Sequence, residues 1–267
     1  MSTKIGFIGA GQMARALARG MVAAGVAKAE ELIAADPIES ARGTFAAEMP
    51  GARLTAENAE VWAAAEDLVL VAVKPQMLAG VLADPAARRN DRLVVSIVAG
   101  ARIARFAEAL GHKRIVRVMP NTPCLVGSGA SGYACGEAVQ PADRRRVEQL
   151  LGAVGIALAV HEEQLDAVTG LSGSGPADVY VLIEGLSDGG GRMGLPREAA
   201  SKLAAQTVLG AAQMVLETGE HPAVLRERVT SPGGTTIAGL QALEDRAFRG
   251  ALLAAVQAAT ERSRELG

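Results

Sequence analysis

Short apolar runs alternate with helix-prone segments along the first half of the chain. The runs cover residues 4–8, 31–36, 67–73, 92–98 and 114–119. They lack the polar alternation of a half-exposed strand, and such uninterrupted runs are typical of strands that are covered on both faces. The pattern therefore predicts an α/β fold with a mostly parallel sheet and crossover helices. Residues 129–134 and 156–160 are two further candidate strands.

The second half of the chain has a helical pattern and no strand-like run of comparable strength. Long helix-prone segments cover residues 176–188, 196–218 and 249–266, with Pro at helix starts and Gly at helix ends. We therefore expect two domains: an α/β domain over residues 1–160 and an all-helical domain over residues 161–267.

The helix expected over residues 196–218 is apolar on most sides. Its polar residues, which fall within about a third of the helix circumference, are Glu198, Lys202, Gln206, Gln213 and Glu217. A helical domain of this length does not easily cover such a helix by itself, so we expect a second subunit to cover it. The alternative is that it forms the centre of a self-contained helical bundle.

A glycine-rich turn joins the first strand to the first helix and contains Gly9, Ala10, Gly11, Gln12 and Met13. Gly9 permits a tight turn, Gly11 removes the Cβ that would block a pyrophosphate, and the Ala that follows Met13 lets the helix pack close to the strand. The N-terminal N–H groups of the helix then point at phosphate. This arrangement predicts dinucleotide binding, with a merely structural tight turn as the alternative.

The carboxyl ends of parallel strands meet at one edge of a sheet, and functional loops gather there. In this chain those loops also include residues 74–76, 99–100 and 120–123. Asp36 ends the second strand, close to the offset of roughly 20 residues at which an acidic residue bonds the adenosine ribose. A carboxylate at this position repels a 2′-phosphate, whereas Arg42 is near enough to reach one. We expect NADH to be used at least as well as NADPH.

Two loops rich in small residues, 171–177 and 229–237, each lead into a helix. Free backbone N–H groups and the positive end of the helix dipole attract an anion to such a turn, and a carboxylate suits it as well as a phosphate. Ordinary capping by Ser and Thr is the alternative.

Composition and charge exclude several classes of function. A formal net charge of −2, with no basic run, argues against a nucleic-acid surface. Cys124 and Cys135 match no metal spacing and no redox motif, so we expect no metal site. The chain has no signal-peptide layout and no apolar stretch of about 18 residues, the length needed to span a bilayer. We expect a cytoplasmic protein without a membrane partner.

Six stretches carry a resemblance to a known family, and they are residues 6–13, 72–75, 119–123, 171–177, 193–196 and 231–236. In order and spacing they resemble pyrroline-5-carboxylate reductase over essentially the whole chain. The Ser-Pro-Gly-Gly loop that begins at Ser231 is the most specific stretch, because general dinucleotide-binding proteins have no reason to carry it. One departure is Asp178, where the family usually has an aromatic residue.

The resemblance implies an oxidoreductase that reduces 1-pyrroline-5-carboxylate to L-proline with NADH or NADPH, the last step of proline biosynthesis. It implies a Rossmann domain followed by a helical dimerisation domain, and dimers that assemble into decamers. The substrate carboxylate would lie on a loop containing Ser231, Gly233, Gly234 and Thr235, with the hydroxyl of Thr236 near the ring nitrogen as a catalytic group.

The same resemblance implies the cofactor contacts. Lys74 would be the second catalytic group and would line the nicotinamide side of the cofactor, and Asn58 would lie near the adenosine. The remaining expected contacts on the cofactor side are Ala72, Val73, Pro75, Ala99 and Gly100. For Lys74, the alternative is a strand-end lysine that simply reaches solvent.

A protonated cyclic imine accepts hydride without a dedicated general acid, which fits a chain whose histidines lie outside all of these motifs. Two other functions stay open. Another imine or β-hydroxyacid reductase of the same plan would carry a catalytic lysine or aspartate at the start of the second domain, where Asp178 but no lysine occurs. The second open function is that of a nucleotide-sensing protein that does not turn over a substrate.

Overall fold

The computed structural model describes residues 4–89 and 91–267 and divides the chain into two compact units. The first unit ends at Ser174 and takes up the chain again from Ala259, and the second spans Gly175–Ala258. The domain boundary expected at residues 160 and 161 falls inside the first unit. The reason is that the segment after residue 160 packs on the sheet, where Leu165 is fully buried.

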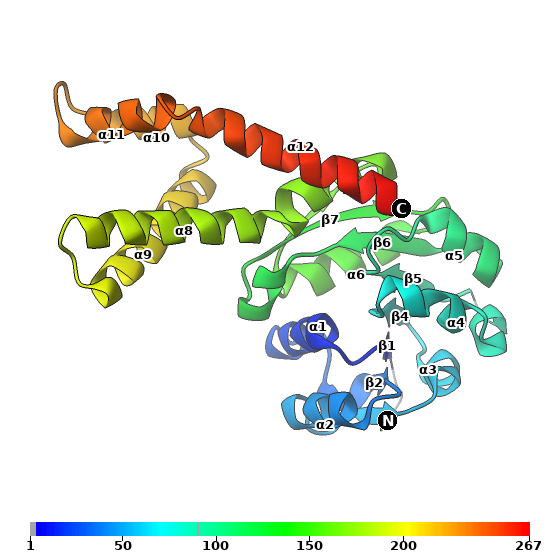
Figure 1. Ribbon diagram of the computed structural model, residues 1–267. Coiled ribbons are helices and arrows are strands. Elements are labelled where there is room, and N and C mark those ends of the chain that lie inside the picture. The colour runs from blue at the N-terminus through cyan, green and yellow to red at the C-terminus, as the bar shows by residue number, and fades with distance from the viewer. Residues whose placement is uncertain (1–3, 90) are drawn as a thin grey trace. The chain divides into compact units, whose positions relative to one another are not determined.

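The first unit is built on one eight-stranded sheet, in the order β3-β2-β1-β4-β5-β6-β7-β8 (Figure 1). The strands are β1 Ile5–Ile8, β2 Leu32–Ala35, β3 Arg53–Thr55, β4 Leu68–Val71, β5 Leu93–Ser96, β6 Ile115–Met119, β7 Gly129–Cys135 and β8 Gly155–Ala159. All neighbours pair in parallel except β6 and β7, which are antiparallel. The mostly parallel fold is therefore confirmed, and both candidate strands are present. The strand β3 was not predicted, because three residues carry too little pattern to identify.

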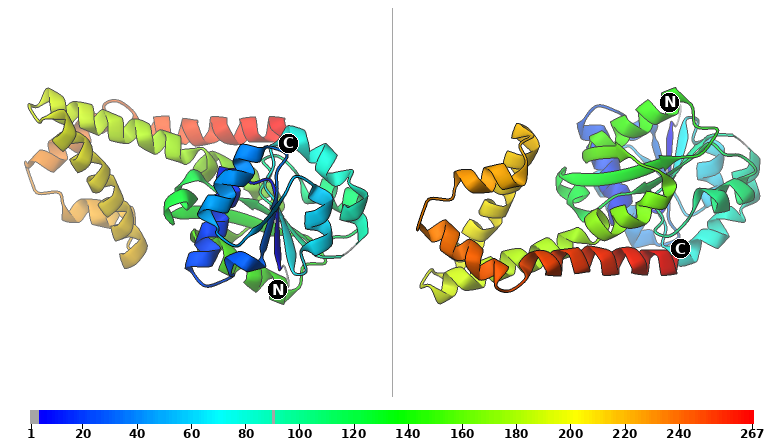
Figure 2. Two further views of the ribbon diagram at one scale, coloured as in Figure 1. Left: turned by 90° about the horizontal axis from the view of Figure 1, so that it is seen from below. Right: turned by 90° about the horizontal axis from the view of Figure 1, so that it is seen from above.

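Helices cover both faces of this sheet (Figure 2). One face packs against α1 Gln12–Ala23, α2 Glu39–Glu48 and α6 Pro141–Gly152, and the other against α3 Asn58–Ala64, α4 Leu78–Leu82 and α5 Ile103–Leu110. Neighbouring side chains of β1 lie on opposite faces of the sheet. Phe7 meets Phe45 edge to face at a centroid distance of 5.8 Å, and Ile8 belongs to the core on the other face. Burial on both faces explains why the strands read as uninterrupted apolar runs.

Short 3₁₀ helices connect the main elements: η1 Ala29–Glu31, η2 Pro75–Met77, η3 Pro85–Arg89, η4 Thr122–Val126 and η5 Glu162–Gln164. After η5 come α7 Leu165–Val168 and a π-helical turn, η6 Thr169–Gly173. The sequence suggested an open, anion-binding turn over residues 171–177. That expectation is wrong for the turn itself, because its residues are helical and the Ser174 N–H donates to the Thr169 carbonyl at 2.8 Å.

The second unit is entirely helical. It contains α8 Gly175–Arg192, α9 Arg197–Thr218, α10 Pro222–Arg228, α11 Thr235–Glu244 and the start of α12 Phe248–Leu266. The three expected helices are present. The first runs past Asp188 through a run of glycines, where Gly190 lets α8 approach Ala200 of α9 closely.

Within residues 175–258 the buried hydrophobic side chains are Ala200 and Ala204. The larger apolar side chains of this unit, Leu216 of α9 among them, are at least partly open to solvent. The helical unit thus has almost no core of its own. Among the described residues, no helix has the length and apolar character needed to cross a membrane.

Candidate functional site

The expected cofactor residues lie at one edge of the sheet in the first unit. Gly9 to Met13 follow β1, Asp36 follows β2, Asn58 starts the helix after β3, Ala72 to Pro75 follow β4, and Ala99 and Gly100 follow β5. Because these five strands are parallel neighbours, their carboxyl ends share one edge. The fold therefore brings together all residues expected on the cofactor side.

The two glycines of the β1–α1 turn have different surroundings. Gly9 has a φ of +98°, and a Cβ there would lie 2.6 Å from the carbonyl oxygen of Ala72, so only glycine fits. A Cβ at Gly11 would meet no atom within 4 Å. The chain itself therefore does not require glycine at residue 11. The absence of a side chain leaves open space there, as expected where a ligand approaches the backbone.

The start of α1 is a ready anion site. Its N-cap is Gly11, no side chain caps the helix, and the first turn holds no acidic residue. The first N–H groups of α1 therefore have no described partner, and the positive end of the helix dipole is uncompensated. A dinucleotide pyrophosphate fits this combination of free donors, open space and positive potential.

Asp36 is already engaged by the backbone. Its Oδ2 accepts from the Ala10 N–H and its Oδ1 from the Ile38 N–H, each at 2.9 Å. Arg42 Nη1 donates to the carbonyl oxygens of Asp36 and Pro37 at 2.7 and 3.1 Å. The carboxylate thus joins the glycine turn to the β2–α2 loop, which the sequence did not reveal, and its remaining lone pairs stay available to a ribose hydroxyl.

Lys74 is an exposed residue at the carboxyl end of β4, immediately before η2. No ion pair or side-chain hydrogen bond is described for it, so its ammonium group is free to meet a ligand or solvent.

The expected substrate residues gather at the start of α11 in the helical unit. Gly234 is the N-cap of α11, no side chain caps this helix, and Gly233 has a φ of +66°. A Cβ at Gly234 would lie 2.2 Å from Ser231 Oγ, so a side chain there would displace the Ser231 hydroxyl. The Gly234 N–H closes the loop by donating to the Ser231 carbonyl at 3.1 Å. The N–H groups of Gly233, Thr235 and Thr236 have no described partners and lie in the same loop as the hydroxyls of Ser231, Thr235 and Thr236.

His221 and Cys124 have structural surroundings. His221 caps α10 by accepting from the Ala223 N–H at 3.2 Å, which is a structural role. Burial raises the pKa of the Cys124 thiol, so it is an unreactive core residue. Among the residues that the structure describes, no group of His, Cys, Asp and Glu is arranged to hold a metal ion.

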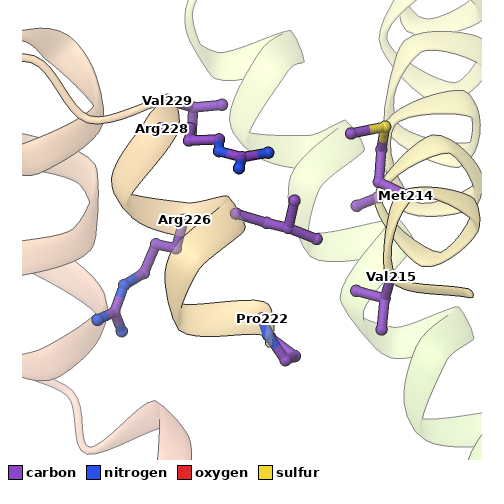
Figure 3. Close-up of a pocket in the computed structure, with 8 residues that line it drawn as sticks. Met214, Val215, Pro222, Arg226, Arg228 and Val229 are labelled. Atoms are coloured by element: carbon purple, nitrogen blue, oxygen red, sulfur yellow. The ribbon is translucent and has the colours of Figure 1, made fainter. Parts of the chain in front are cut away.

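The helical unit also has an apolar groove of about 370 Å³ between α9 and α10 (Figure 3). Met214 and Val215 of α9 face Pro222 and Val229 across it, with Arg228 at its border. Its lining is mostly apolar, with Arg226 and Arg228 as the charged side chains, and it is distinct from the loop that begins at Ser231.

Comparison with known proteins agrees with this geometry. Residues 162–266 match the family "Pyrroline-5-carboxylate reductase dimerisation", and residues 4–100 match "NADP oxidoreductase coenzyme F420-dependent". The chain therefore carries a dimerisation domain. A pyrroline-5-carboxylate reductase of Synechocystis sp. is 45% identical over 267 residues, which are 100% of this chain and 99% of the relative.

Two solved structures are also similar over their whole length. A pyrroline-5-carboxylate reductase from Coxiella burnetii is 35% identical with a TM-score of 0.93, covering 100% of this chain and 99% of that one. A Plasmodium falciparum pyrroline carboxylate reductase with NADP bound is 36% identical with a TM-score of 0.86, covering 99% and 98%. With its open glycine turn, its Ser-Pro-Gly-Gly loop and this full-length similarity, the chain belongs to the pyrroline-5-carboxylate reductase family.

Proposed function

We propose that this chain reduces 1-pyrroline-5-carboxylate to L-proline with NADH or NADPH, the last step of proline biosynthesis. The observation that carries the proposal is the similarity over the full length to reductases named for this substrate. The two halves of the chain have different roles: the α/β half binds the dinucleotide, and the helical half binds the substrate and dimerises.

On the cofactor side, the free N–H groups at the start of α1 hold the pyrophosphate, and Gly11 gives it room. Asn58 contacts the adenosine. The residues from Ala72 to Pro75, with Ala99 and Gly100, line the nicotinamide side, and Lys74 provides a positive charge there. The reduced nicotinamide supplies a hydride to the C=N carbon of the substrate.

On the substrate side, the N–H groups of Gly233 and Thr235 and the hydroxyls of Ser231 and Thr235 hold the carboxylate, while Gly234 closes the loop through its N–H bond to the Ser231 carbonyl. The Thr236 hydroxyl bonds the ring near its nitrogen. A cyclic imine is basic enough to take up a proton before it binds, so the nitrogen becomes the amine of proline without a general acid. Catalysis is then mainly positioning, which accounts for several kcal/mol in such reactions.

We propose that the working molecule is an obligate homodimer, with five dimers forming a decamer. The exposed apolar side chains of the helical unit and the groove beside Met214 support a second copy as the covering partner. The cytoplasmic location inferred from the sequence stays a prediction.

Cofactor preference is a finer prediction. The Asp36 carboxylate, fixed by two backbone N–H groups, stands where a 2′-phosphate would lie and repels it, so NADH should serve at least as well as NADPH. Specificity constants for both cofactors test this, and a tenfold preference for NADPH would contradict it. In the same assay Asp36→Asn, which removes the charge, should shift the preference toward NADPH.

Substrate-dependent oxidation of NADH or NADPH tests the main proposal. The purified chain should oxidise the cofactor with 1-pyrroline-5-carboxylate and release proline in equal amount. Oxidation of NADH or NADPH by acyclic imines alone, or reduction of NAD+ or NADP+ by a β-hydroxyacid, would favour another reductase of the same plan. Cofactor binding without turnover of any of these substrates would indicate a sensing protein. The full-length similarity favours neither alternative.

A further inference from the structure

A buried side-chain network joins two motifs that the proposed mechanism leaves without a role. Asn121 Oδ1 accepts from the Ala130 N–H at 2.9 Å, and Asn121 Nδ2 donates to Ser172 Oγ at 3.3 Å. Ser172 Oγ in turn donates to the Ala130 carbonyl at 3.0 Å. Three segments, the loop after β6, the start of β7 and the π turn, thus share one triangle of bonds. Only 9% of Asn121 is exposed to solvent.

The strand register explains why an asparagine is needed. The antiparallel β6–β7 ladder pairs Val118 with Tyr133 and Met119 with Gly132, so its continuation would set Asn121 opposite Ala130. The regular ladder ends at Met119, and Pro120 follows it. The Asn121 side chain bonds the Ala130 N–H instead, which holds the loop to the sheet one pair beyond the last paired residue.

Close packing holds the π turn against the same strands. A Cβ at Gly173 would lie 2.5 Å from Met119 Cε, and a Cβ at Gly132 would lie 2.8 Å from Val168 Cγ1. The turn therefore rests directly on the ends of β6 and β7. Single π turns within helices occur frequently at functional sites. Here the turn brings the Ser172 hydroxyl within reach of both Asn121 and Ala130.

The loop held in this way, residues 120–123, leaves the carboxyl end of β6. That strand neighbours β5, whose own end loop contains Ala99 and Gly100 on the nicotinamide side of the proposed site. We propose that Asn121 and Ser172 are positioning residues for hydride transfer, which set loop 120–123 against the nicotinamide end of the cofactor. This inference rests on the proposed function. Neither side chain touches the reacting atoms in this account.

The test uses the full-length chain with Ser172→Ala, Asn121→Ala and the double variant. Ser172→Ala should lower kcat about ten- to a hundredfold, the scale of a small misplacement of reacting groups. The KM and Kd for NADH should change less than threefold, because neither side chain bonds the glycine turn at the start of α1. The double variant should lose no more than the worse single one, because the two side chains act as a unit.

Hydrogen exchange gives a readout that is independent of turnover. In both single variants the Ala130 amide should lose protection in the absence of cofactor. Ser172→Thr restores the hydroxyl and should recover most of kcat, since Ser172 borders a cavity of about 170 Å³ that accommodates one methyl. Ser128→Ala is the matched control. Ser128 is an exposed serine on the same connection with no described side-chain bond, and its removal should leave both readouts unchanged.

Two results would overturn the inference. One is kcat within twofold of the unmodified chain in Ser172→Ala and Asn121→Ala. The other is a fall in kcat that merely follows a lower melting temperature and that Ser172→Thr does not restore. If the unmodified chain itself shows no turnover of 1-pyrroline-5-carboxylate, the proposed function fails first and this inference with it.

Discussion

At the scale of single residues, the hydroxyl of one side chain and the ring nitrogen of another give specific, measurable effects. The first of these side chains is Thr236. It is the second residue of α11 and half-buried, and the helix is capped by Gly234 with no side-chain contribution. The Thr236 hydroxyl is therefore not used as a helix cap, which favours a role toward the substrate.

Thr236→Val keeps the shape of the side chain and removes its hydrogen bond. A bond to a charged group is worth about 1.5–3 kcal/mol, so kcat/KM should fall roughly ten- to a hundredfold with little change in cofactor affinity. Steady-state kinetics and melting on the same sample check this. Thr44→Val, which removes a hydroxyl that bonds only its own helix, serves as the control. Unaltered efficiency with a lowered melting temperature would make Thr236 a structural residue.

His112 makes stability depend on pH. Burial lowers its pKa below the usual 6.5, with Asp91 opposing and Arg114 adding to the shift. Its Nδ1 accepts from the Arg114 N–H at 3.2 Å, and its Nε2 is buried with no partner among the residues that the structure describes. As the pH falls below 6.5, the unfolded chain binds a proton at this position before the folded chain does, so stability is lost.

We expect the melting temperature to fall between pH 7 and pH 5.5 less steeply in His112→Asn than in the unmodified chain. The asparagine keeps an acceptor for the Arg114 N–H but does not titrate. A parallel His221→Asn variant, changed at an exposed helix cap, should leave the slope as it is. If the melting temperature changes with pH equally steeply in all three proteins, His112 does not cause the pH dependence.

At the scale of elements, the two glycines of the β1–α1 turn meet different requirements: Gly9 is needed for folding and Gly11 for binding the cofactor. Gly9 is required by the backbone, because its φ is +98° and a Cβ would strike the Ala72 carbonyl. Gly11 has an ordinary φ of −69° and faces open space, so the fold itself tolerates a side chain there.

Two alanine variants test this separation. Gly9→Ala should lower the melting temperature of the protein without cofactor by several degrees, because strain and a clash combine. Gly11→Ala should melt like the unmodified chain but bind NADH at least tenfold more weakly, since its methyl occupies the place of the pyrophosphate. Fluorescence titration and melting curves measure both. Equal cofactor affinity in Gly11→Ala would argue that the turn is only structural.

At the scale of the whole molecule, the helical unit leaves most of its large apolar side chains exposed. Its buried hydrophobic side chains are two alanines, while Leu203, Leu209 and Leu216 of α9 are more than half exposed. Monomeric proteins rarely expose an apolar patch beyond about 300–600 Å². We expect a dimer or larger assembly at every practical concentration. Light scattering at micromolar concentration checks this, and an active monomer would refute it.

Periodicity and turn chemistry were sufficient for much of this fold. Uninterrupted apolar runs predicted the parallel strands, because a strand covered on both faces has no polar side. Proline and glycine marked the long helices, and the glycine turn marked the dinucleotide edge. These features are local, so the sequence by itself determined them. It also indicated that α9 needs a covering partner, since the composition of one helix shows how many of its sides are apolar.

The tertiary structure decided what depends on contacts between distant segments. The strand β3 is held by its pairing with β2 and not by its own pattern. The turn after Val168 is π-helical and packs on Met119, which no local signal announces. Asn121 and Ser172 lie far apart in sequence, and they meet because the π turn packs beside the end of β6. The sequence therefore determined which elements form, and three-dimensional packing determined which polar side chains meet, because hydrogen bonds between segments depend on register and not on composition.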